Sequence, residues 1–129
     1  DDPLYARCSY TLGVLLEIEE RLPEAERAYL DSVKYFARSL GESHPDHCQS
    51  LECLAGTYRT QGRLSDAAAA YQKLLPLKEE MSVLGGTLGD VTTTLNNLAS
   101  VFVQLGDLRA AEVVYRKTVR IREHQYGHS

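Results

Sequence analysis

An internal repeat is the feature that most constrains the fold of this chain. The segments 54–71 and 98–115 agree at every position of the pattern L-A-x2-(Y/F)-x3-G-x-L-x2-A-x3-Y. A third segment, 12–29, follows the same spacing of apolar and small residues and departs from it where Glu20 replaces the glycine. The three segments start 42 and then 44 residues apart. Self-similarity at a regular period is typical of proteins that stack one structural unit, so we expect three units here.

Each unit has the pattern of two helices joined by a tight turn. The segments 51–58 and 95–102 place apolar residues at i, i+3, i+4 and i+7, which is the buried stripe of an amphipathic helix. Gly62 and Gly106 then suit a helix end, because glycine tolerates the left-handed backbone found there. The alanine and tyrosine that follow allow a second helix to pack closely. We therefore predict an all-α fold, an α-solenoid of three antiparallel helical hairpins.

Glycine- and proline-containing segments separate the predicted elements. The predicted helices cover residues 3–20, 23–40, 46–61, 65–84, 90–105 and 108–126, and the repeats cover about 3–42, 45–86 and 89–129 of a single domain, 1–129. Pro76 lies inside the fourth predicted helix and removes one backbone hydrogen bond, so we expect a bend or an interruption there. Because the chain opens on Asp1 rather than Met, we expect it to be a segment of a longer protein.

The turns between paired helices give a sharper expectation. Gly62 and Gly106 should end their helices with a positive φ. Glu20 lacks the conformational freedom of glycine, so we expect its turn to close differently.

The spacing L-x2-L-A-x2-Y…A-x3-Y resembles the signature of the tetratricopeptide repeat, with Leu51 in a position that often holds Trp. The repeats exceed the usual length of about 34 residues. That length, together with the segments 40–46, 95–99 and 121–123, is similar to the long-repeat kinesin light chain subclass. The resemblance implies a cytoplasmic adaptor or scaffold, not an enzyme, that binds a peptide or extended segment of a partner protein in a concave groove.

In the family that the chain resembles, the first helix of each hairpin lines this groove. The resemblance assigns to the groove the residues that lie off the apolar stripe of these helices. The candidate partner-binding residues are Arg7, Tyr10, Gln49, Glu52, Arg59, Thr93, Asn96, Asn97, Ser100 and Gln104.

Two of these residues have complementary chemistry for a peptide ligand. Arg59 can bind a carboxylate with two parallel hydrogen bonds, and Asn97 can both donate to and accept from a peptide backbone. Clamps for chaperone C-terminal tails in this superfamily use paired Lys and Asn with an Arg. Only Arg7 and Asn97 fit that arrangement here, so a carboxylate clamp is a disfavoured alternative.

Composition excludes several other functions. The formal net charge of −4 and the pI of about 5.5 lack the positive field that nucleic acid requires. No apolar run approaches the roughly 18 residues of a membrane span. Cys8, Cys48 and Cys53 are odd in number and have no C-x2-C spacing, so we expect buried thiols in a reducing compartment rather than a disulfide framework.

Catalytic and metal sites find little support in the sequence, and we expect no cofactor. His44, His47 and Cys48 could supply three zinc ligands at a helix start, but no fourth ligand is evident, and turn and cap residues are the commoner explanation. The acidic run at 17–20 has no histidine or nucleophile at a suitable spacing.

The end of the chain suggests a second kind of partner. The last predicted helix carries apolar residues with no following unit to cover them: Val113, Val114, Tyr115, Val119, Ile121 and Tyr126. Solenoid ends expose apolar surface unless they are capped. A structural solenoid segment that self-associates through this helix is therefore the alternative to a peptide-binding adaptor.

Overall fold

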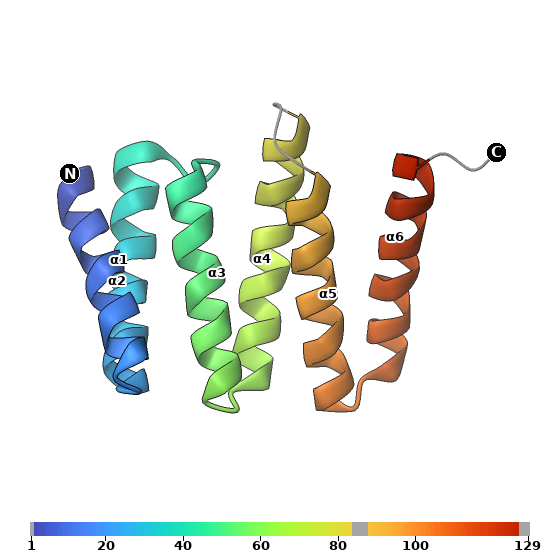
Figure 1. The fold of residues 1–129 in the computed structure, drawn as a ribbon, viewed down its shortest axis with the longest axis horizontal. Coiled ribbons are helices and arrows are strands. Elements are labelled where there is room, and N and C mark those ends of the chain that lie inside the picture. The colour runs from blue at the N-terminus through green and yellow to red at the C-terminus, as the bar shows by residue number, and fades with distance from the viewer. Residues whose placement is uncertain (1, 84–87, 127–129) are drawn as a thin grey trace.

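The structure, a computed structural model, describes residues 2–83 and 88–126 and consists of six helices arranged in chain order (Figure 1). Their bounds are Pro3–Ile18 (α1), Leu22–Leu40 (α2), Pro45–Thr60 (α3), Leu64–Val83 (α4), Leu88–Leu105 (α5) and Leu108–Tyr126 (α6). No strand occurs in these two stretches. Each helix packs against the next one along the chain, so the two ends of the molecule are far apart and are formed by α1 and α6. The all-α prediction is confirmed.

One turn joins the two helices of each hairpin, and the three turns have the same geometry. Gly62 and Gly106 have φ of 78° and 83°, as predicted. Glu20 has φ of 63°, so the prediction that its turn closes differently is wrong. In each turn the following N–H, such as that of Arg21, donates at 2.9 Å to a carbonyl five residues back. The stacked hairpins impose this geometry, and Glu20 adopts it despite the strain that a Cβ brings to a left-handed backbone.

The fourth helix is not interrupted at its proline. Helix α4 extends through Pro76. Leu74, two residues before the proline, is fully buried. Proline removes a single N–H donor, and the hydrogen bonds of the other turns together with core packing hold the helix.

The core lies between successive helices along the whole stack. The apolar stripes of α3 and α5 are buried as predicted, with Tyr58 and Phe102 packed at their edges. Cys48 is buried, but Cys8 is exposed, so the expectation of three buried thiols is wrong for that residue. Cys8 is exposed because it lies on the outer side of the first helix, where no preceding helix covers it.

The final helix has the exposed apolar surface that its sequence suggested. Val113 and Val119 are exposed, whereas Val114 is buried and Ile121 packs against the core. The side chain of Tyr126 lies outside the described part of the chain.

Candidate protein-binding face

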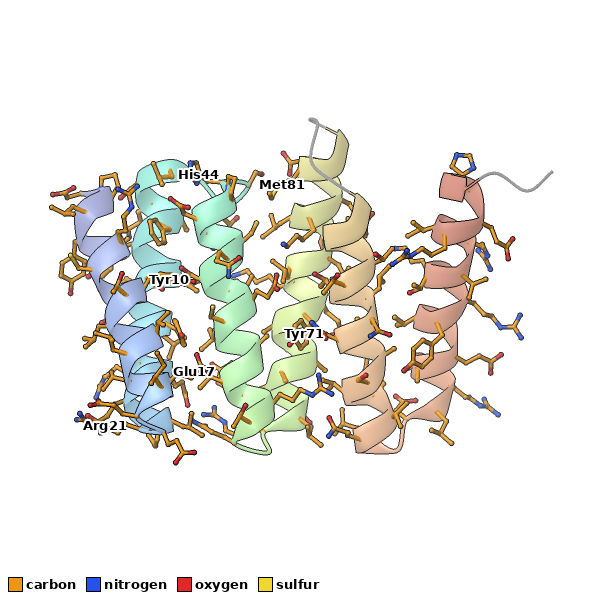
Figure 2. All side chains as sticks on the ribbon, in the orientation of Figure 1. Tyr10, Glu17, Arg21, His44, Tyr71 and Met81 are labelled. Carbon is orange, nitrogen blue, oxygen red and sulfur yellow. The ribbon has the colours of Figure 1, made fainter. Side chains whose placement is uncertain are left out.

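The ten candidate partner-binding residues come from α1, α3 and α5, the first helices of the three hairpins. We call the surface that these residues form the first-helix face. Tyr10, one of these residues on α1, is labelled in the side-chain view (Figure 2). Because residues three and four apart lie on the same side of a helix, the candidates within each helix fall close together on its surface.

Between α1 and α3 the face contains a small hollow. Arg7 Nη2 lies 3.7 Å from Asp46 Oδ2, and the Cys53 thiol donates to Tyr10 Oη at 3.8 Å. The hollow has a volume of about 260 Å³, and its lining residues are Arg7, Tyr10, Thr11, Phe36, Asp46 and Gln49. It combines an aromatic wall with an exposed guanidinium, so it can accept an apolar or acidic side chain.

In the middle of the face, Glu52 is not a free carboxylate. Lys78 Nζ of α4 lies 3.2 Å from Glu52 Oε1, and the lysine side chain is almost completely buried. The ion pair therefore compensates the charge of both groups, and Glu52 has little capacity left for an external cation. Lys78 is absent from the predicted site residues because it lies on a second helix, whereas all of the candidates lie on first helices. The signal was present, since Lys78 is 42 residues after the buried Phe36 and occupies the same position of its repeat.

Arg59 lies between α3 and α5. Its Nε donates to Gln104 Oε1 at 3.2 Å, so the structure brings these two candidates together. Because this acceptor is a neutral amide, the hydrogen bond leaves the guanidinium charge uncompensated. Burial raises the pKa of Tyr71, and the neighbouring Arg59 partly opposes this rise. Arg59 thus interacts with Gln104 of α5 and with Tyr71 of α4.

The α5 part of the face is polar and more open. Thr93 and Asn96 are exposed, while Asn97 and Ser100 are half-buried. The described hydrogen bond of Arg59 goes to Gln104, so Asn97 and Arg59 are separate contact points on the face and not a preformed pair.

The buried thiols and the first glutamate of the acidic run at 17–20 have structural roles. Burial raises the pKa of Cys53 and of Cys48, which keeps both as neutral thiols and not as nucleophiles. The hydroxyl of Tyr29 donates to Glu17 Oε1 at 2.7 Å, so Glu17 accepts a hydrogen bond from the core of its own hairpin.

The histidines at the start of α3 serve the local backbone. His44 caps the helix, since its Nδ1 accepts from the N–H of Asp46 at 3.1 Å. His47 is fully buried, and its Nδ1 bonds the carbonyl of Glu42 at 2.8 Å. Across residues 2–83 and 88–126, no three His, Cys, Asp or Glu side chains gather in a way that could hold a metal ion.

Comparison with known protein families decides the relationship. Two family models described as the tetratricopeptide repeat match residues 4–80 and 91–128. The chain belongs to the tetratricopeptide repeat family. Members of this family are, in general, protein–protein interaction modules. No curated protein matches the sequence closely enough to count as a relative.

Solved structures share the tetratricopeptide repeat fold. The crystal structure of BtubC (BKLC) from P. vanneervenii superposes with a TM-score of 0.86 at 21% identity, over 96% of this chain and 49% of that one. The TPR domain of Arabidopsis FLU gives 0.75 at 17% identity, over 94% and 97%. A putative kinesin light chain from Podosopora anserina gives 0.74 at 17% identity, over 99% and 59%. The fold thus resembles kinesin light chain repeats, and this chain spans only about half the length of BtubC.

Among the described residues, no helix combines the length and the apolar character that a membrane span requires.

Proposed function

We propose that the chain is an adaptor or scaffold module that binds an extended acidic or mixed segment of a partner protein across the first-helix face. The observation that carries this proposal is the position of Arg59, whose uncompensated charge lies between two first helices. Arg59 binds a carboxylate of the ligand, and Asn97 binds its backbone. The hollow beside Arg7 receives a further side chain. The free cysteines suit a reducing compartment, so the proposal includes a cytoplasmic location.

The electrostatics favour an acidic ligand over a basic one. Glu52 is neutralised by Lys78, and Glu17 accepts a hydrogen bond from Tyr29. The half-buried Arg59 donates to a neutral amide, so its guanidinium can still bind a ligand carboxylate, whereas the exposed Arg7 lies 3.7 Å from Asp46 and shares its charge with that residue. A charge-assisted hydrogen bond to either group is stronger than one between neutral partners.

The test uses short fluorescent peptides of acidic, neutral and basic composition, with anisotropy as the readout of binding. Acidic peptides should bind best. Arg59→Ala and Asn97→Ala should each weaken binding about five-fold or more, because truncating an anchor typically costs at least about 1 kcal/mol. Added salt should weaken the parent more than Arg59→Ala, since screening acts on the lost charge.

A matched control is Arg27→Ala on α2, which removes an exposed arginine from a second helix. This variant should bind as the parent does. If Arg27→Ala abolishes binding while both first-helix variants bind normally, the opposite face is the working surface and the proposal fails.

A further inference from the structure

The outer surface of α6 carries exposed apolar side chains around a hollow. The repeat places Tyr29, Tyr71 and Tyr115 at equivalent positions, and their exposed fractions are 0%, 3% and 39%. Tyr115 differs because α3 packs on α2 and α5 packs on α4, but α6 has no helix beyond it in the structure. Leu108 and Val119 are exposed beside it, and together they line a hollow of about 570 Å³. In the two junctions that the structure describes, a first helix packs at the equivalent position.

The outer surface of α1 is the matching helix. Four positions that are buried in both α3 and α5, where those helices pack on the preceding hairpin, are exposed in α1. In α5 they are Val91, Thr94, Leu98 and Val101, and in α1 they are Tyr5, Cys8, Leu12 and Leu15. The stripe on α1 is at least as apolar as the stripe with which α5 packs on α4.

An ion pair within the chain shows how two hairpins are held in register. Arg63, at the turn of the second hairpin, bonds Asp66 on its own helix and reaches back to Glu26 on α2 of the first hairpin. The Glu26 side chain is mostly buried in this junction.

The two ends of the chain carry the same groups without the cross-junction bond. Arg21 is 42 residues before Arg63 and bonds Glu24, the equivalent of Asp66. Glu112 is equivalent to Glu26, two repeats later, and lies exposed on α6, where it pairs with Arg116 on its own helix. If a hairpin with Arg21 followed α6, the Arg21 guanidinium would meet Glu112 as Arg63 meets Glu26.

The overall charges of the two ends are also complementary. Helix α6 carries more basic than acidic residues: Arg109, Arg116, Lys117, Arg120 and Arg122 against Glu112 and Glu123. The segment 2–20 has the opposite balance: Asp2, Glu17, Glu19 and Glu20 against Arg7. Opposite charges at the two surfaces promote encounter and fix orientation.

We infer that a second copy of this chain docks its α1 on α6, so that copies stack head to tail and continue the solenoid across the junction. The two surfaces differ, so the contact is heterologous and leaves a free end on each side. The junction repeats the packing of α5 on α4, with Leu12 and Leu15 covering Tyr115 and with Arg21 bonded to Glu112.

Sedimentation velocity on the 129-residue chain tests the stacking. The parent should show an average mass that rises with concentration beyond that of a dimer. One variant blocks the α1 surface (Leu12→Glu with Leu15→Glu), and another blocks the α6 surface (Leu108→Glu with Val119→Glu). All four positions are exposed, so both variants should keep the helical circular dichroism of the parent. Each variant alone should be a monomer, and an equimolar mixture should form a dimer of one copy of each.

Three results would overturn the inference. A parent that stays monomeric up to about 1 mM, the limit of weak association, would show that a different partner covers these surfaces. An α1-blocked variant that still dimerises would indicate a symmetric contact between two α6 helices. A mixture that fails to associate would show that the two surfaces do not fit each other.

A charge exchange tests the register. Glu112→Arg should weaken association of the parent about ten-fold, because it places like charges at the junction. Adding Arg21→Glu to the same chain should restore most of the loss. Association that is insensitive to Glu112→Arg, or that Arg21→Glu weakens further, would contradict this register.

Discussion

At the scale of single residues, Glu20 shows that the stack of hairpins dominates local preference. It is the one non-glycine residue with positive φ in the described chain, and its turn has the hydrogen bonds of the two glycine turns. A left-handed conformation costs an ordinary residue roughly 1 kcal/mol relative to glycine.

Replacing Glu20 by glycine should therefore stabilise the chain. We expect the free energy of unfolding to rise by about 0.5–1 kcal/mol for Glu20→Gly and to fall by about 1 kcal/mol or more for Gly62→Ala, which introduces the same strain. No atom lies within 4 Å of a Cβ added at Gly62, so the loss would reflect backbone strain alone. Urea denaturation measures both values. A loss of stability in Glu20→Gly would mean that the glutamate side chain contributes more than its backbone costs.

His47 is the second residue whose position conflicts with its chemistry. It is fully buried, its Nε2 has no hydrogen-bond partner in the described structure, and its equivalent in the third repeat is the buried Val91. Burial lowers the pKa of His47, although the bond to the Glu42 carbonyl opposes this effect. The folded chain thus disfavours protonated His47.

The pH dependence of stability follows from the lowered pKa of His47. The unfolded chain takes up a proton near the usual pKa of about 6.5, whereas the folded chain does so only at lower pH. Stability is therefore complete above about 6.5 and is lost as the pH falls toward the folded pKa. His47→Val should remove this part of the loss, so urea midpoints measured from pH 7.5 to 5 should fall less in the variant than in the parent. If the urea midpoints of the parent and the variant fell equally with pH, burial would not lower the pKa of His47.

At the scale of elements, the sequence predicts most of the fold. Every predicted helix end lies within two residues of the observed end, because apolar periodicity and the glycine turns are local signals. The proline does not mark a helix end, because α4 continues through Pro76 with only one backbone donor missing. The exposure of individual side chains was predicted less well than the helix ends. Cys8 has the same position in α1 as the buried Ser50 in α3, and only its place at the end of the stack distinguishes them.

The candidate face was predictable only in part. The sequence period puts Arg59 and Gln104 on first helices, but the bond between them depends on how α3 and α5 pack. Lys78 belongs to a second helix and still determines the charge of the first-helix face through Glu52. Pairing across helices depends on side-chain reach, which repeat spacing alone does not define.

At the scale of the whole molecule, stability should vary along the stack. In a solenoid each hairpin contacts only its neighbours, so stability is roughly a sum of hairpin and junction contributions. The middle hairpin, α3 and α4, has a junction on both sides and contains many fully buried residues, including Leu51, Ala55 and Leu74. The outer helices α1 and α6 each have one uncovered side.

Hydrogen exchange should reveal this gradient. In dilute protein, where the chain is monomeric, amides of α3 and α4 should exchange most slowly and those of α1 and α6 fastest, because terminal helices can open without breaking the central junctions. Uniform protection across all six helices would instead mean that the stack unfolds as one unit. Raising the protein concentration provides a second comparison within the same experiment. Head-to-tail stacking would slow exchange in α1 and α6 specifically and would leave α3 and α4 unchanged, since binding stabilises only the surfaces that it covers.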